Sequence, residues 1–122
     1  MSTHLPIAVV FPCFNEAGRL NSDAYLAFAE AHPTVRLCFV NDGSTDATLK
    51  RLHAIAECLP GRVEIVSYEK NRGKSGAVRA GVLHVISTYR EETEYIGFWD
   101  ADLATPLRSE EHTSELQSRS DL

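Results

Sequence analysis

Four short apolar runs alternate with three segments of helical periodicity over the first hundred residues of the chain. Runs of this length are typical of β-strands, and we predict strands at residues 7–11, 35–40, 63–68 and 95–99. The first run is continuously apolar and is closed by Pro12, which favours a central strand covered on both faces. The third alternates apolar and polar residues, so we expect it nearer an edge of the sheet.

Between the runs, apolar residues recur at steps of three and four, which predicts helices over residues 22–31, 45–59 and 75–89. Asn21 or Ser22 can cap the first helix, and Ser44 or Thr45 the second. The inner face of the third helix is expected to carry four apolar residues: Val78, Val82, Val85 and Ile86.

Strict alternation of strand and helix with short connections predicts an α/β fold with a Rossmann-like parallel sheet. In such a sheet the carboxyl ends of all strands lie on one edge, where ligands bind. Acidic residues follow three of the predicted strands at that edge: Glu16, Asp42, Asp100 and Asp102. This convergence is more specific than any single motif.

Size and composition restrict the class of protein. The chain has 122 residues, 43% hydrophobic and 24% charged, as expected for one globular domain or part of a larger one. A net charge of -5 without a basic patch argues against a nucleic-acid partner. No apolar run approaches the roughly 20 residues of a membrane span, and residues 1–6 do not resemble a secretion signal. Three widely spaced cysteines predict free thiols and a cytoplasmic location.

Asp100 and Asp102 are separated by one residue at the end of an apolar strand. Two carboxylates in this arrangement can hold Mg²⁺ against the phosphates of a ligand. The alternative is a solvated turn with no ligand.

Three further polar residues are candidates at the same edge, each with a structural alternative. Asp42 can accept a hydrogen bond from a nucleobase or ribose, or form a turn before the next helix. Glu16 can face the ligand, or complement the dipole of the following helix. Lys74 can bind the nucleotide if it faces this edge; otherwise residues 71–76 are a plain helix-entry loop, since they match no phosphate-loop pattern.

Four motifs in order resemble those of the family 2 glycosyltransferases, and they span nearly all of residues 7–107. They are Val10-Phe11-Pro12-Cys13-Phe14-Asn15-Glu16, Val40-Asn41-Asp42-Gly43-Ser44-Thr45-Asp46-Ala47-Thr48, Asn71-Arg72-Gly73-Lys74, and Trp99-Asp100-Ala101-Asp102-Leu103-Ala104-Thr105-Pro106. The last motif is most similar to the dolichyl- and polyprenyl-phosphate glucosyl- and mannosyltransferases.

The resemblance implies a GT-A fold, a UDP- or GDP-sugar donor, a Mg²⁺ or Mn²⁺ ion, and sugar transfer with inversion. A lipid phosphate or a saccharide is the implied acceptor, with the parent enzyme at the cytoplasmic face of a membrane. By position, Pro12, Phe14 and Glu16 would line the base and ribose pocket, and Asp42 would bind the base. Asp100 would face the ribose or the metal, and Asp102 would ligate the metal. Phe14 departs from the family pattern, which usually has Tyr there.

The last fifteen residues are interpreted separately. Residues 108–118 resemble the in-frame translation of a short-read sequencing adapter, so residues 108–122 are expected to be a non-native, disordered tail. Residues 1–107 would then be an incomplete GT-A domain. The general base would lie beyond Leu107, and the chain would bind the donor without transferring sugar. An incomplete sheet is also expected to expose apolar surface.

Two other functions remain open from the residues alone. A non-catalytic nucleotide-binding module of Rossmann type would carry a glycine fingerprint, which is absent. A nucleotidyltransferase would carry a glycine-rich basic loop after the first strand, where residues 12–16 do not supply one.

Overall fold

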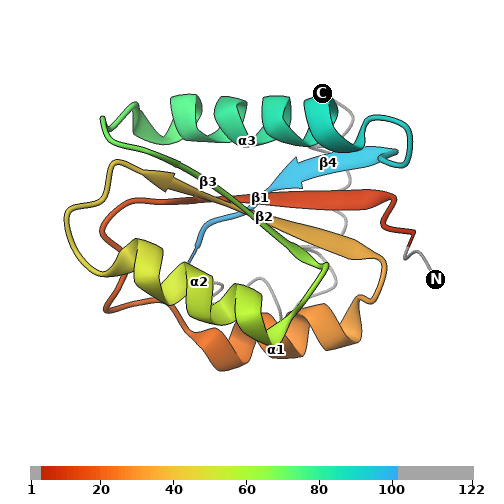
Figure 1. Ribbon diagram of the computed structural model, residues 1–122, viewed down its shortest axis with the longest axis horizontal. Coiled ribbons are helices and arrows are strands. Elements are labelled where there is room, and N and C mark those ends of the chain that lie inside the picture. The colour runs from red at the N-terminus through yellow and green to blue at the C-terminus, as the bar shows by residue number, and fades with distance from the viewer. Residues whose placement is uncertain (1–3, 102–122) are drawn as a thin grey trace.

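A four-stranded parallel sheet forms the centre of the protein, with strand order β3-β2-β1-β4 (Figure 1). The computed structural model describes residues 4–101. The strands are β1 (Ile7–Cys13), β2 (Val35–Asp42), β3 (Val63–Tyr68) and β4 (Tyr95–Phe98), and the helices are α1 (Ser22–Ala31), α2 (Thr48–Cys58) and α3 (Gly73–Tyr89). The predicted α/β fold with a Rossmann-like parallel sheet is confirmed.

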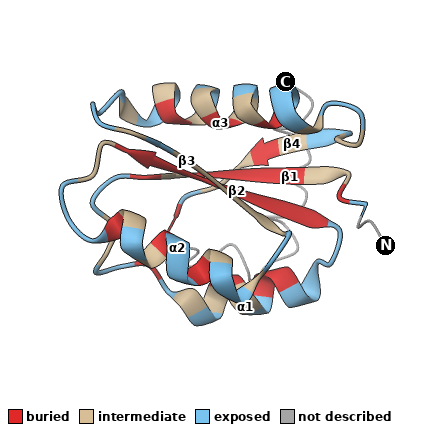
Figure 2. Ribbon diagram, viewed as in Figure 1, coloured by how far each residue is buried: buried red, intermediate tan, exposed pale blue. Residues whose placement is uncertain are grey.

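The molecule has three layers, because α1 and α2 cover one face of the sheet and α3 covers the other (Figure 1). Every residue of β2 is buried, and β1 is buried along most of its length (Figure 2). Side chains of β1 alternate between the layers: Val9 and Phe11 pack toward α1 and α2, whereas Ala8 and Val10 pack toward α3. No helix within residues 4–101 is long and apolar enough to cross a membrane.

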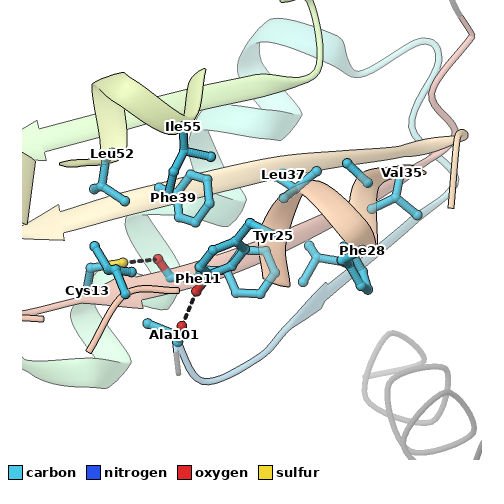
Figure 3. Close-up of a cluster of buried hydrophobic side chains, with 13 residues drawn as sticks. Phe11, Cys13, Tyr25, Phe28, Val35, Leu37, Phe39, Leu52, Ile55 and Ala101 are labelled. Atoms are coloured by element: carbon cyan, nitrogen blue, oxygen red, sulfur yellow. Dashed lines mark hydrogen bonds between the residues drawn. The ribbon is translucent and has the colours of Figure 1, made fainter. Parts of the chain in front are cut away.

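Aromatic packing joins α1 to the sheet (Figure 3). The ring of Phe11 lies 5.2 Å from that of Tyr25 and 5.3 Å from that of Phe39, measured between centroids. The Tyr25 hydroxyl donates a hydrogen bond to the carbonyl oxygen of Ala101. The segment that follows β4 is thereby tied to the core, three residues after the strand ends.

Pro12 lies inside β1, although the sequence predicts that the strand ends at Phe11. Pairing of β1 with β4 stops at Val10, whose carbonyl accepts a hydrogen bond from the Trp99 N–H at 3.0 Å. Val10 and Pro12 are alternate residues of β1, so their backbone groups point to the same side of the strand. That side is paired with β4 at Val10 but no longer at Pro12. Its missing N–H therefore costs no hydrogen bond, and β1 continues beside β2.

The inner face of α3 differs from the prediction. Its buried residues are Ala77, Gly81 and Val85, whereas Ile86 is 40% exposed. Of the four predicted residues only Val85 is fully buried. A Cβ on Gly81 would lie 2.5 Å from Cγ1 of Val10, so a stripe of small residues lets α3 approach the sheet more closely than valine side chains would.

Candidate functional site

Loops from four strands meet at the carboxyl edge of the sheet, which we define as residues 14–21, 43–47, 69–72 and 99–101 together with the strand ends that precede them. Cys13 of β1 lies opposite Asn41 of β2, and Asp42 of β2 lies opposite Tyr68 of β3. This parallel register brings Glu16, Asp42 and Asp100 to one edge, as the sequence predicts. Asp102 lies outside the described residues.

The loop after β1 is locked to the loop after β2. Asn15, which has a positive φ of 51°, donates its N–H to Oγ of Ser44 at 3.0 Å. Its side-chain Oδ1 accepts the N–H of Thr45 at 2.8 Å. The prediction that Ser44 or Thr45 caps α2 is wrong, because α2 starts later, at Thr48. Both residues instead bind the loop after β1. The cap predicted for α1 is confirmed at Asn21, whose Oδ1 accepts the Ala24 N–H.

Thr48 and Asp46 hold the backbone around Glu16. The Glu16 N–H donates to Oγ1 of the fully buried Thr48 at 2.9 Å, and that hydroxyl donates in turn to Asp46. Asp46 also accepts the Ala17 N–H at 3.3 Å. The hydrogen bond from the Thr48 side chain is the main reason that the pKa of Asp46 lies below its ordinary value. The sequence analysis includes both residues in its second motif but assigns neither a role, although an Asp two positions before a Thr is the spacing of a side-chain turn.

The predicted base and ribose residues differ in exposure. Phe14 is 45% exposed, whereas Pro12 is partly buried in β1. The Glu16 carboxylate accepts a hydrogen bond from Nε of Arg19 at 3.0 Å, within the same loop. An exposed ring can stack on a base, and a carboxylate can accept a hydrogen bond from a hydroxyl.

Asp42 is buried, with 2% of its surface exposed, and its carboxylate is heavily used by the protein itself. Oδ1 accepts the Arg72 N–H at 2.7 Å, and Oδ2 accepts the Gly73 N–H and the Asn71 side-chain amide at 3.0 Å each. Burial, followed by proximity to the Asp42 carboxylate, raises the pKa of Tyr68 to about 12. Three of the roughly four acceptor positions of this carboxylate are therefore used by the loop before α3.

Lys74 faces the end of β4. Its Nζ lies 2.7 Å from Oδ1 of Asp100, and the two side chains are 59% and 66% exposed. An ion pair this exposed contributes little to stability. The ion pair places an ammonium group beside the first carboxylate of the acidic motif, so Lys74 faces the carboxyl edge of the sheet.

A divalent cation fits the chemistry of this edge. Asp100 offers an exposed carboxylate that already attracts a cationic group. Within residues 4–101 no cluster of three or more His, Cys, Asp or Glu side chains could enclose a metal ion. One or two carboxylates completed by phosphate oxygens and water are the usual Mg²⁺ environment, so a metal here would need the phosphates of a ligand.

A second polar cluster lies near the amino ends of the strands, away from this edge. Glu64 binds Nε2 of His84 at 2.8 Å and the Tyr89 hydroxyl at 2.5 Å. The Arg36 guanidinium stacks on the Tyr89 ring, 3.4 Å from its centroid. A surface cavity of about 590 Å³ beside Tyr89 is lined by His4 and residues 87–92. These contacts fasten the second half of α3 to β2 and β3, and they do not reach Lys74.

Comparison with known proteins gives a family match over most of the chain. The model described as "Glycosyl transferase family 2" matches residues 8–109. The dolichyl-phosphate beta-glucosyltransferase of Saccharomyces cerevisiae is 35% identical over 91 residues, covering 68% of this chain and 27% of the yeast protein. That of Mus musculus is 33% identical over 124 aligned positions, covering 91% of this chain and 36% of the mouse protein. The chain thus spans about a third of the curated relatives it matches.

Among solved structures, the fold is similar to that of the mannosyltransferase PcManGT from Pyrobaculum calidifontis in complex with GDP-Man and Mn²⁺. The TM-score is 0.63 at 24% identity, and the match covers 80% of this chain and 27% of the other. At this identity the likeness concerns the fold.

Proposed function

Because the chain belongs to the family 2 glycosyltransferases, we propose that residues 1–107 form the nucleotide-sugar-binding part of such an enzyme. The Rossmann-like part of a GT-A fold, predicted from the sequence, agrees with the parallel sheet and with its structural neighbours. The ligand of this part is a UDP- or GDP-sugar bound at the carboxyl edge of the sheet.

One observation carries the proposal: the Lys74 ammonium stands 2.7 Å from the Asp100 carboxylate at the end of β4. A cation beside an exposed carboxylate, on the edge where parallel sheets bind ligands, suits a diphosphate accompanied by a metal ion. The ammonium can meet a phosphate oxygen, and the carboxylate can hold the metal.

The remaining roles follow the order of the loops. Phe14, with Pro12, stacks on the base, and Glu16 accepts a ribose hydroxyl. Asp42 accepts a base N–H. Asp100 binds the metal together with Asp102. Mg²⁺ or Mn²⁺ would stabilise the negative charge that develops on the departing nucleoside diphosphate.

For the parent enzyme we propose transfer with inversion to a lipid phosphate such as dolichyl or polyprenyl phosphate, or to a saccharide. The relatives named for dolichyl phosphate support the first acceptor. The chain of 122 residues is proposed to bind donor without transferring sugar. Free buried thiols at Cys13 and Cys38 support a cytoplasmic location.

Calorimetric titration of the full chain with UDP and GDP, with and without Mn²⁺, tests the donor site. We expect metal-dependent binding of one nucleotide, weakened about tenfold or more in Asp100→Ala, which corresponds to about 1.4 kcal/mol or more. Asp23→Ala removes an exposed carboxylate from α1 and is the matched control. Binding that ignores Mn²⁺, or a preference for NAD, would contradict the proposal.

A further inference from the structure

The start of α3 has no cap of its own. Its N-cap residue, Arg72, makes no side-chain hydrogen bond to the first turn, and no acidic residue lies in that turn. The free N–H groups of a helix start need an acceptor, and a negative charge there is favourable. Asp42 supplies both from β2, since its carboxylate accepts the N–H groups of Arg72 and Gly73 at 2.7 and 3.0 Å.

Gly43 makes this contact possible. Its φ of +68° suits glycine, and a Cβ at this position would lie 2.5 Å from the backbone nitrogen of Asn71. The loop before α3 therefore rests directly on the backbone of the loop after β2. The Asn71 side chain closes the contact by donating to both the carbonyl and Oδ2 of Asp42, at 3.1 and 3.0 Å.

Lys74 follows Gly73 directly, so the fixed start of α3 determines where its ammonium group can reach. A continuous path runs from the Asp42 carboxylate through the Gly73 N–H to Lys74, and from Lys74 to Asp100. The buried end of this path is rigidly bonded, whereas the outer ion pair is exposed. Asp42 therefore fixes the backbone from which Lys74 projects, and Asp100 contacts its ammonium group.

We propose that Asp42 is a positioning residue for Lys74, through the start of α3, and thereby controls how tightly the diphosphate is held. This rests on the proposed function for the identity of the ligand. Three hydrogen bonds to the Asp42 carboxylate come from the loop before α3, and a base contact alone requires none of them. Asp42 thus acts on the phosphate end of the donor as well as on its base.

The test compares a nucleoside, its monophosphate and its diphosphate, using the base that the wild-type chain prefers. If Asp42 positions Lys74, Asp42→Asn weakens diphosphate binding about tenfold more than nucleoside binding, since a charge-assisted contact is lost. Lys74→Met produces the same selective loss, and the double variant loses little more than either single one. Asn71→Ala leaves the Asp42 carboxylate in place and yet shows the loss in the same direction.

Matched controls are Lys50→Met, an exposed lysine on α2, and Asp23→Asn on α1; both keep wild-type affinities. Equal weakening of all three ligands in Asp42→Asn, with Asn71→Ala unchanged, would overturn the proposal and leave Asp42 as a base contact only.

A ligand-free measurement separates this proposal from the proposed function. Nuclear Overhauser contacts between the Lys74 and Asp100 side chains, and slow hydrogen exchange at the Arg72 and Gly73 amides, are expected in the wild type and lost in Asp42→Asn and Asn71→Ala. If wild-type protein shows these signals but binds no nucleotide, the donor site fails while the positioning stands. Signals that persist in both variants refute the positioning.

Discussion

At the scale of single residues, Glu64 illustrates how a partly buried carboxylate fastens a helix to a sheet. Burial opposes its ionisation, but hydrogen bonds from His84 and Tyr89 outweigh that effect, and its pKa lies below the ordinary 4.5. Arg36 on β2 adds a favourable positive charge. The ionised form is therefore the one that stabilises the fold.

The stabilising effect of the ionised Glu64 carboxylate can be tested by substitution. Glu64→Gln should lower the free energy of unfolding at pH 7 by about 1 kcal/mol, because hydrogen bonds to a charged acceptor are weakened. A depressed folded pKa gives a stabilisation that is complete above pH 4.5 and is lost as the pH falls through the folded value. Urea unfolding of both proteins from pH 7 to pH 3 should show the difference shrinking toward zero. A difference independent of pH would contradict this account, and Glu69→Gln, an exposed carboxylate, is the control.

The sequence predicts the positions of site residues better than their contacts. Glu16, Asp42 and Asp100 could be placed at one edge because each follows a strand of a parallel sheet. The pairing of Lys74 with Asp100 could not, since it joins residues 26 positions apart and depends on how α3 lies on the sheet. The contacts of Asp42 with Arg72 and Gly73 could not be predicted either, because they use backbone N–H groups, which every residue except proline carries.

At the scale of elements, the close packing of α3 on the sheet depends on the absence of a side chain at Gly81. Gly81→Ala should destabilise the protein by about 1–3 kcal/mol through overpacking, offset by roughly 1 kcal/mol of helix propensity. The reason is the close approach of the new Cβ to Cγ1 of Val10, at 2.5 Å, and to Cγ2 of Val40, at 2.9 Å. Thermal and urea unfolding measure the change. Gly18→Ala, where a Cβ meets nothing within 4 Å, is the control, and a stabilised Gly81→Ala protein would mean that α3 is free to withdraw.

Hydrophobic periodicity predicted every strand and helix of the described residues but misjudged the start of α2 and details of β1 and α3. It ended β1 at Pro12, because the pattern cannot show that β4 departs from that side of the strand. It also favoured valine and isoleucine over Ala77 and Gly81 as the inner face of α3. A close helix–sheet contact is made by small residues, which carry little weight in a hydrophobic pattern.

At the scale of the whole molecule, the described part exposes apolar side chains, as the sequence predicts. Leu83 and Ile86 on α3 are 49% and 40% exposed, and Tyr95 on β4 is 47% exposed. Within residues 4–101, β4 pairs only with β1 and so forms an edge of the sheet. Exposed apolar groups of this kind favour self-association.

The double variant Leu83→Lys, Ile86→Lys should therefore scatter less light at high protein concentration than wild type, with an unchanged free energy of unfolding. Its added positive charge brings the net charge of -5 closer to zero, which by itself promotes association. A decrease would thus reflect the removal of apolar surface. Ser87→Lys, Thr88→Lys places the same charges on exposed polar residues of α3, and an equal decrease there would disprove the explanation.

The strand order has a consequence for the chain as it is synthesised. β1 pairs with β2, which follows soon after it, and with β4, where Ile7 meets Tyr95. At roughly 5–20 residues per second, the ribosome completes β4 several seconds after β2. During that interval β1 presents unpaired N–H and C=O groups along one side. The earliest strand of the sheet is among the last to be fully paired, so the nascent protein passes through a stage at which another chain can take the place of β4.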